Sequence, residues 1–321
     1  MKKKGLILGL FLLCLTIFGC AKKQGFTNTI FAFDTNINVT LFEGKEENLN
    51  DICEIYFRIS KLADAYKEYK DLQNICAINK AIKNNELEFI IGIDLYNMLN
   101  VDLELRNALN PASGALTTLW KETINSKTLP PSSEIEGLVL AIKNNELDYI
   151  LTKEDNNYKL NVNTNLVQFD LGAIAKGYAT ALVKKYLTDN SITKYMIDCG
   201  RSTILLGTKD DSTAYNVGVD NTNNFVIRDV KGKCIGSASI LERSVIIENV
   251  RYHHIIDLNT GYPTTNLDTV VLIGDNPLML DILSTYLMIK PDEAESIINK
   301  YNVDSYYMFK DGELVKSGTK S

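Results

Sequence analysis

The order of secondary-structure patterns along the chain is the feature that most constrains its fold. Helices are predicted over residues 47–65, 92–109 and 131–145, where the apolar residues suit a helix that packs on one face. Beyond residue 187 short strand-like segments dominate, followed by two helices at 278–289 and 292–300. Because strands and helices are segregated, the sequence predicts an α+β fold with mixed, largely antiparallel sheets, and not a parallel doubly wound sheet.

Two shorter patterns predict strands near the ends of the chain. Residues 30–42 alternate between apolar and polar side chains, which is typical of one half-buried strand. Near the other end, Asp311-Gly312 lies between two apolar segments, and this dipeptide favours the tight turn of a hairpin. A further break, "NPASG" at 110–114, is expected to end the helix before it.

The N-terminus resembles a lipoprotein signal. Three lysines precede an apolar segment that is shorter than the ~20 residues of a membrane-spanning helix. It ends in "IFGC", which resembles a lipobox with Cys20 as the lipidated residue. We expect residues 1–19 to be a signal peptide, 20–30 a tether and 31–321 the folded domain. The alternative is an uncleaved N-terminal anchor. Either reading predicts an extracytoplasmic protein held at a membrane, on the periplasmic side of the inner membrane or at the cell surface.

Composition excludes several classes of function. The formal net charge is −6 and no basic stripe is present, which argues against a nucleic-acid partner. The two histidines, His253 and His254, are adjacent, so a site with several histidine ligands from different segments is excluded. The cysteines after position 20 are widely spaced without a CxxC pair, so a zinc site is not expected; a disulfide stays open.

The segment "FDLGAIAKGYA" from Phe169 places an acid, small residues and a lysine where a helix begins. Unpaired N–H groups at a helix start attract phosphate, and Gly172 lets a ligand approach the backbone. Asp170 could accept hydrogen bonds from a ribose or a ring, and Lys176 could meet a phosphate. The alternative is a helix of small residues packed tightly on a sheet.

The segment "HHIIDLNTGYPT" from His253 holds both histidines of the chain. A strand is expected to end at Asp257, and the following Asn-Thr-Gly-Tyr-Pro sequence favours a stiff turn. This pattern predicts that His254 and Asp257 lie close together at the end of the strand, where they could serve catalysis. A purely structural histidine is the alternative.

The apolar helix predicted over 278–289 contains three polar side chains: Asp281, Ser284 and Thr285. Asp281 and Thr285 are four residues apart and therefore share one helix face. A buried carboxylate and hydroxyl need partners, and such oxygens suit a hard cation such as Mg²⁺. Alternatively, Asp281 only starts the helix and the hydroxyls bond back to the backbone.

Together these segments resemble the FAD:protein FMN transferase (ApbE) family, once called thiamine biosynthesis lipoproteins. "DLGAIAKGYA" resembles the family's "DLGGIAKGYA", "HHIIDLNTGYP" resembles "HIIDPRTGYP", and "DILSTYLMI" is similar to "DALSTALFVLG". Further similarities are "FAFDT" to "FxMGT", "YKDLQNICAIN" to "YxxxSELxxLN", and "ALNPASGALTTLW" to "AFDPTVGPLVNLW". They follow the family's order and span about residues 31–289.

The resemblance implies two lobes around a flavin cleft and assigns site residues by position. The implied metal is Mg²⁺, bound by Asp281, Thr285 and the backbone carbonyl of Ala173, with Ser284 adjacent. His254, Asp257 and Lys176 are our candidate catalytic residues. The flavin contacts carried over from the family are Phe33, Tyr69, Ala108, Leu109, Asn110, Asp170, Lys176 and Ile255.

The implied reaction cleaves FAD, attaches FMN through a phosphoester to a threonine or serine of an acceptor protein, and releases AMP. The family's acceptors suggest a subunit of a membrane redox complex as the partner. Two alternatives remain: an FAD pyrophosphatase that produces FMN and AMP, and a non-catalytic flavin-binding lipoprotein.

This chain departs from the family pattern at several positions. "GRS" at 200–202 stands for the family's "GGN", and "SASILER" at 237–243 stands for "TSGxYER". Leu258 replaces a usual proline and Phe33 a usual methionine. Arg201 is expected to reshape the flavin pocket without changing the class of reaction.

Overall fold

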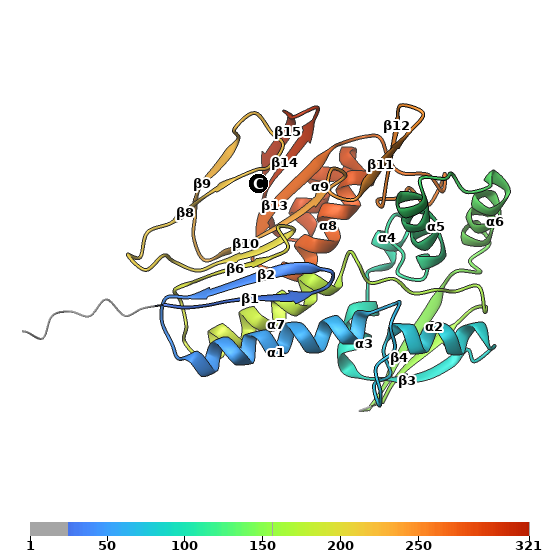
Figure 1. Ribbon diagram of the computed structural model, residues 1–321, viewed down its shortest axis with the longest axis horizontal. Coiled ribbons are helices and arrows are strands. Elements are labelled where there is room, and N and C mark those ends of the chain that lie inside the picture. Colours follow the sequence, from blue (N-terminus) through green and yellow to red (C-terminus); the bar gives the residue numbers. More distant parts are fainter. Residues whose placement is uncertain (1–24, 156, 321) are drawn as a thin grey trace, which may run out of the picture.

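The computed structural model describes residues 25–155 and 157–320, and within them an eight-stranded antiparallel sheet forms the centre (Figure 1). The signal peptide and the lipidated Cys20 that the sequence predicts lie outside this part. None of its helices combines the length and hydropathy that a membrane span requires. In spatial order the strands are β1 (Phe26–Ala32), β2 (Thr35–Leu41), β6 (Tyr195–Cys199), β7 (Thr203–Leu206), β10 (Lys233–Ser239), β13 (Thr269–Gly274), β14 (Val303–Lys310) and β15 (Glu313–Thr319).

The central strand β13 is buried on both faces, which explains its unbroken apolar sequence. Val270 and Leu272 belong to the main core, on the side of helix α8 (Pro277–Ile289). Val271 and Ile273 face a second cluster, to which strands β8 (Tyr215–Gly218) and β9 (Val226–Val230) contribute. Successive strand residues point to opposite faces, so both faces must be covered for all six residues to be buried.

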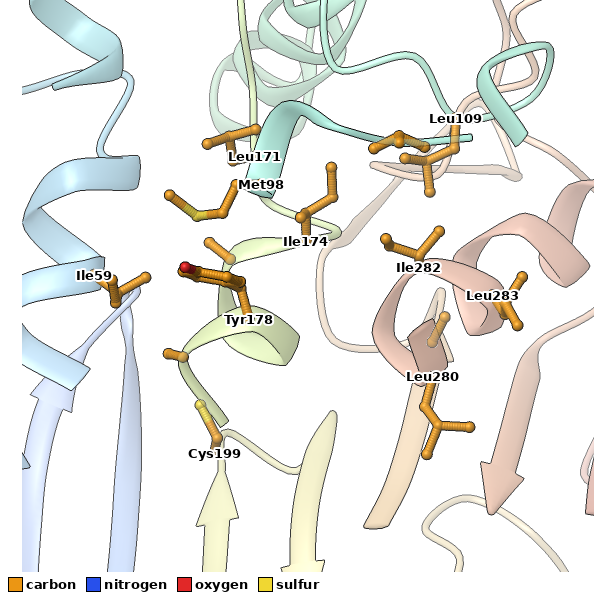
Figure 2. Close-up of a cluster of buried hydrophobic side chains, with 14 of the residues drawn as sticks. Ile59, Met98, Leu109, Leu171, Ile174, Tyr178, Cys199, Leu280, Ile282 and Leu283 are labelled. Carbon is orange, nitrogen blue, oxygen red and sulfur yellow. The ribbon is translucent and has the colours of Figure 1, made fainter. Parts of the chain in front are cut away.

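Helix α8 packs unusually close to the sheet. A Cβ atom at Gly236 of β10 would lie 2.6 Å from the Cβ of Leu280, so only glycine permits this approach. Helices α7 (Ala175–Asp189) and α1 (Glu46–Ala63) extend the layer beside α8. Figure 2 shows the start of α7, with Ile174 and Tyr178, between Met98 and Leu171 on one side and α8 on the other.

A smaller sheet of three strands, in the order β3-β5-β4, lies beside the helical segment of the chain. Leu160 from this sheet and Val270 from the large sheet belong to one continuous core. The two-lobe division implied by the resemblance therefore stays a prediction. The elements of this part are α2 (Ile75–Lys83), β3 (Glu88–Ile91), α3 (Ile93–Leu99), α4 (Leu103–Arg106), α5 (Gly114–Ser126), α6 (Ser132–Lys143), β4 (Tyr149–Glu154) and β5 (Asn157–Val162).

The α+β prediction is confirmed, and so is the hairpin at Asp311-Gly312, but three element predictions are wrong. The strand expected to end at Asp257 already ends at His253. The strand expected over 30–42 is a hairpin, because Phe33 and Asp34 both adopt positive φ (54° and 57°) and turn the chain between β1 and β2. The helix expected over 92–109 breaks after Leu99 into α3 and α4. Helix α5 was not predicted, since it begins directly in the "NPASG" break.

A separate two-stranded hairpin consists of β11 (Ser244–Ile247) and β12 (Val250–His253). Glu248 and Asn249 form its turn with positive φ of 50° and 67°, a conformation that suits two-residue hairpin turns. Helix α9 (Ala294–Lys300), preceded by the 3₁₀ turn Pro291–Glu293, leads into β14. The four cysteines of the described residues are buried and free, so the open disulfide is not formed.

Candidate active site

A cleft of about 1550 Å³ brings together most of the side chains that the sequence singled out. Its wall contains the start of α7, one face of α8, the turn after β1, and the segments on both sides of the β11–β12 hairpin. The residues predicted from sequence that line it are Phe33, Tyr69, Ala108, Leu109, Asn110, Asp170, Ala173, Lys176, His254, Ile255, Asp281 and Thr285. Ser284 and Asp257, though predicted, are not among its described lining residues.

Asp170 stands at the entrance to α7 and is positioned from both sides. The side chain of buried Asn79 pairs with both backbone groups of Phe169, at 2.7 and 2.9 Å, and so fixes the residue before it. The carboxylate then accepts a hydrogen bond from the N–H of Gly172 at 2.7 Å, and the hydroxyl of Tyr66 donates to it at 3.4 Å. Asp170 therefore presents a fixed acceptor to the cleft.

Asp281 is the most deeply buried acid of the site, with 3% of its surface exposed. It accepts hydrogen bonds from the N–H of Gly177 at 2.9 Å and from the hydroxyl of Thr203 at 3.2 Å. The ammonium of Lys176 lies 3.9 Å away and also donates to the Gly172 carbonyl at 3.0 Å. Burial raises the pKa of Asp281, although Lys176 and both hydrogen bonds favour the anion. A cation bound next to this carboxylate would stabilise its negative charge.

The contact between α7 and α8 depends on Gly177. A Cβ atom there would lie 2.5 Å from the Cβ of Asp281 and 2.7 Å from the carbonyl of Pro277. The absence of a side chain thus lets the two helices approach until the Gly177 N–H reaches the carboxylate. The second glycine of "GAIAKGYA" therefore has a packing role that also creates the acidic corner.

The oxygen atoms around Asp281 fit a hard cation. In a regular helix the Gly177 N–H would donate to the carbonyl of Ala173, but here it donates to Asp281. Within the described residues no other backbone N–H donates to that carbonyl, and Ala173 lines the cleft. Thr285 lines the cleft as well. Carboxylate, hydroxyl and carbonyl oxygens are the ligand types that Mg²⁺ prefers.

One carboxylate does not balance a divalent cation, so further negative charge would have to come from a bound ligand. Residues 25–155 and 157–320 contain no group of three or more His, Cys, Asp or Glu side chains that could hold a metal by themselves. Ser284 is fully buried and is not among the residues that line the cleft, and its hydroxyl donates to the carbonyl of Asp281 at 3.0 Å inside the helix. For Ser284 the backbone-bonding alternative from the sequence is correct.

His254 lines the cleft, and a hydrogen bond defines its tautomer. Its Nδ1 lies 3.3 Å from the backbone carbonyl of Arg243, and a carbonyl can only accept, so Nδ1 carries the proton in the neutral ring. Nε2 then keeps a lone pair. Burial lowers the pKa of His254 from 6.5 to about 4, so the ring is neutral near pH 7. A neutral imidazole with a free acceptor nitrogen can act as a base.

Asp257 and His253 serve the local structure. One oxygen of Asp257 accepts hydrogen bonds from the backbone and the side chain of Asn259, at 2.9 and 3.0 Å. Its backbone carbonyl accepts from Gly261 at 2.8 Å, so the aspartate shapes the turn. His253 is buried, with Nε2 2.7 Å from the Thr264 carbonyl. The structure thus does not bring the Asp257 carboxylate to His254 by any hydrogen bond between described residues.

The other predicted flavin contacts line the cleft from several separate segments. Phe33 occupies the left-handed turn between β1 and β2, and its N–H donates to Ser60 at 2.9 Å. The hydroxyl of Tyr69 donates to Asp64 at 2.9 Å. The side chain of Asn110 holds its own turn, accepting from Ala112 at 3.0 Å, which leaves chiefly the backbone of 108–110 for a ligand.

Several cleft residues had no signal in the sequence that we recognised. Ser113 is 4% exposed, lines the cleft, and carries the single buried side-chain oxygen of the described residues without a hydrogen-bond partner. Lys121 places its ammonium 3.8 Å from the ring centre of Tyr66. The polar face of α5, at Thr117, Thr118 and Lys121, could have been found from helical spacing had α5 been recognised.

Arg201 reaches the cleft from the turn after β6. It adopts φ of 61°, which a residue with a side chain rarely does, and its guanidinium is 3.0 Å from Asp220 and 4.0 Å from Glu242. Both acids also line the cleft. The positive charge expected to reshape the flavin pocket is thus paired with two acids at the rim.

Comparison with known proteins identifies the family to which this chain is similar. A family model described as "ApbE family" matches residues 33–307. A protein of Klebsiella pneumoniae (strain 342) named FAD:protein FMN transferase is 26% identical over 219 residues, 66% of each chain. One of the same name from Treponema pallidum (strain Nichols) is 26% identical over 224 residues, 64% of this chain and 61% of that one. The chain thus spans slightly less than two thirds of the length of these curated relatives.

Solved structures agree with the fold. The ApbE protein of Thermotoga maritima superposes with a TM-score of 0.74 at 22% identity, covering 93% of this chain and 97% of that one. The flavin transferase ApbE of Vibrio cholerae gives a TM-score of 0.73 at 18% identity, with the same two coverages. At these identities the likeness concerns the fold alone.

Proposed function

Since its residues 33–307 match that family model, the chain belongs to the ApbE family, and from this premise we propose that it is a Mg²⁺-dependent FAD:protein FMN transferase. The proposed reaction moves the FMN half of FAD onto a threonine or serine hydroxyl of an acceptor protein and releases AMP. The relatives named FAD:protein FMN transferase support the reaction class.

The observation that carries the proposal is the oxygen-lined corner at Asp281. Asp281, Thr285 and Ala173 line the same cleft as the start of α7, and no backbone N–H of the described residues donates to the Ala173 carbonyl. These three groups would hold Mg²⁺, which when bound would neutralise the diphosphate and stabilise charge on the departing AMP. A carboxylate with two neutral oxygens leaves room for phosphate oxygens as further ligands, and this suits a dinucleotide substrate.

The residues around this corner would orient the diphosphate. Lys176 contributes a positive charge 3.9 Å from Asp281, and the N-terminal turn of α7 adds partial positive charge. Both reduce repulsion between the diphosphate and an incoming hydroxyl. Asp170, fixed by Gly172 and Tyr66, would accept a hydrogen bond from a ring or ribose of FAD. Phosphoryl transfer depends mainly on such positioning and charge neutralisation.

His254 is the proposed general base. Its Nε2 would take the proton of the acceptor hydroxyl while that oxygen forms a bond to the phosphorus of the FMN half. The bond from this phosphorus to the bridging oxygen breaks, and AMP leaves with that oxygen and its electron pair. The bond from Nδ1 to the Arg243 carbonyl orients the ring for this step. Asp257 keeps the role of holding the loop.

The test is to incubate the full chain with FAD, MgCl₂ and a candidate acceptor protein. A mass gain of one FMN unit on the acceptor, abolished by EDTA, is the expected result. Free FMN and AMP without modification of the acceptor would identify the pyrophosphatase alternative. Tight FAD retention in EDTA with no turnover after Mg²⁺ is restored would identify the flavin-binding lipoprotein.

The proposed setting is extracytoplasmic. Lipidation at Cys20 would hold the domain at a membrane, on the periplasmic side of the inner membrane or at the cell surface, and the proposed acceptor is a membrane redox-complex subunit. Metabolic labelling with a fatty-acid analogue, compared between wild type and Cys20→Ala, tests the anchor. Label on both proteins would reject lipidation at Cys20.

A further inference from the structure

The outer backbone edge of β11 in the β11–β12 hairpin has no strand partner in the described structure. Between Ser244 and His253, backbone hydrogen bonds other than those within the hairpin are absent among the described residues. Its exposed apolar side chains include Ile246, at 61% exposure, and Val250, at 50%. A free edge of this kind readily accepts another strand unless charges or proline protect it. Strand β11, Ser-Val-Ile-Ile, has neither.

The hairpin is nevertheless firmly anchored on its other side. Tyr252 stacks on buried Trp120 of α5, with ring centres 5.4 Å apart and an angle of 12°. The indole N–H of Trp120 in turn donates to the carbonyl of Gly261 at 2.7 Å. At the base, His253 is held by the Thr264 carbonyl. The free edge is therefore a fixed template, and a partner strand would meet it without ordering it first.

The base of β11 is continuous with the cleft. Arg243 and Ser244 both line the cleft, and the Arg243 carbonyl is the group that holds Nδ1 of His254. A chain that runs along β11 towards the cleft would therefore pass the imidazole. Strand β1, at the edge of the separate eight-stranded sheet, also reaches the cleft at Phe31, but no hydrogen bond between described residues ties it to His254.

The register identifies which backbone groups point outward. Ile247 and Val250 flank a two-residue turn, so they form a hydrogen-bonded pair. Along an antiparallel ladder, hydrogen-bonded pairs alternate with pairs that are not hydrogen-bonded to each other. Val245 and Tyr252 then form the next hydrogen-bonded pair. The N–H and C=O groups of Ser244 and Ile246 therefore point away from β12, towards the free edge.

From these observations we propose that β11 is the docking edge for the acceptor protein. An extended acceptor segment containing the target threonine or serine would pair with Ser244 and Ile246 and so bring its hydroxyl to Nε2 of His254. This inference rests on the transferase function proposed above. Backbone pairing supplies affinity that depends little on sequence, and the pockets of the cleft select the hydroxyl residue.

The main test uses proline at the outward position. Ile246→Pro removes the outward N–H without removing a hydrogen bond of the hairpin itself. Ile246→Thr keeps the N–H and is the matched side-chain control. Thr29→Pro, at an outward position of β1, an edge strand of the eight-stranded sheet, is the matched proline control. The probe is a pool of short peptides, each with one central threonine or serine between randomised residues, incubated with FAD and MgCl₂.

We expect Ile246→Pro to raise the KM for peptides about tenfold, the effect of losing one or two backbone hydrogen bonds. FAD affinity and metal-dependent cleavage of FAD in the absence of peptide should stay within twofold of wild type. Ile246→Thr and Thr29→Pro should leave peptide KM within about threefold. Equal kinetics for Ile246→Pro and wild type would overturn the docking inference, and so would a larger defect in Thr29→Pro.

Hydrogen exchange gives a second measurement that needs no variant. Saturating peptide should slow exchange of the Ser244 and Ile246 amides, while the Val245 amide, already bonded within the hairpin, changes little. Unchanged exchange at both outward amides, or their protection by self-association before peptide is added, contradicts acceptor docking. If wild type cleaves FAD but modifies no peptide and no acceptor protein, the transferase proposal itself fails, which is a distinct result.

Discussion

Two aspartates of the sequence, Asp281 and Asp257, both suggested chemistry, but the structure gives them opposite surroundings. Asp281 lies within an apolar helix, is buried, and receives hydrogen bonds from α7 and β7. Asp257 lies in a surface turn and receives hydrogen bonds from Asn259, two residues further along the chain. The partners of the first come from distant segments; those of the second come from its own turn.

The difference shows when a polar residue is a strong signal of function. A carboxylate among Leu and Ile side chains must be compensated, because an unpaired buried charge is strongly destabilising. Its persistence therefore points to a ligand or a partner. In a Gly-, Pro- and Asn-containing turn, aspartate is already explained by the turn itself. The predictions that follow test this contrast between the two acids.

The largest effect is expected for Asp281→Asn. The amide can still accept from Gly177 and meet the Thr203 hydroxyl, so the variant removes the charge and keeps the packing. We expect FMN transfer to fall on the order of 1000-fold, as for loss of a group that stabilises transition-state charge. The measurement is the rate of acceptor modification at saturating FAD and MgCl₂. Asp257→Asn is the matched control and should stay within about threefold.

His254→Gln should reduce transfer on the order of 100-fold, because glutamine can hold the Arg243 carbonyl but cannot take the hydroxyl proton. FAD affinity, followed by flavin fluorescence, should change little. A variant that transfers FMN at the wild-type rate would exclude His254 as the base and leave the loop with a structural role only.

Gly177→Ala tests the helix contact that forms the acidic corner. The new methyl group would lie 2.5 Å from Cβ of Asp281, so α7 and α8 must separate. We expect the unfolding free energy to fall by about 1–3 kcal/mol, the usual effect of overpacking, together with a loss of metal affinity. Urea unfolding and magnesium titration measure the two effects. Normal stability with normal magnesium affinity would show that the close contact is dispensable.

Ser113→Ala removes the buried hydroxyl that lacks a partner. Without ligand the variant should be as stable as wild type or more stable by about 1 kcal/mol, since an unsatisfied polar group is lost. If a ligand satisfies this hydroxyl, FAD binding should weaken several-fold. Thermal unfolding with and without FAD separates these effects: the stabilisation by FAD should shrink. An unchanged FAD effect would mean that the ligand does not contact Ser113.

The smallest effect concerns pH. Burial lowers the pKa of His254 to about 4 from its ordinary 6.5, and that of His253 is also lowered. Between these values the unfolded chain binds more protons, so the unfolding free energy decreases as pH falls from 6.5 towards 4. His254→Gln should flatten this dependence in urea titrations across the window. An equal slope in both proteins would mean that His254 is not buried as a neutral ring.

The elements that were predicted correctly are those with a clear local sequence pattern. Helices α1 and α8 and the hairpin at Asp311-Gly312 have clear periodicity or turn residues. The hairpin at Phe33-Asp34 was missed because phenylalanine is rarely left-handed; here its N–H bonds to Ser60, a distant residue of α1. Helix α5 was missed because its first residues read as a loop, although its packing around Trp120 makes it a helix.

The sequence by itself determined the chemical inventory: one acid and one hydroxyl a helical turn apart, a small-residue helix start, and a single pair of histidines. These follow from local spacing, which a chain carries without folding. Only the tertiary structure decided which of them meet. The contact of α7 with α8 through Gly177, the donation of the Gly177 N–H to Asp281 and the tautomer of His254 all depend on segments about 10 to more than 100 residues apart. Such pairings arise from packing, because close contact between distant segments has no counterpart in local sequence pattern.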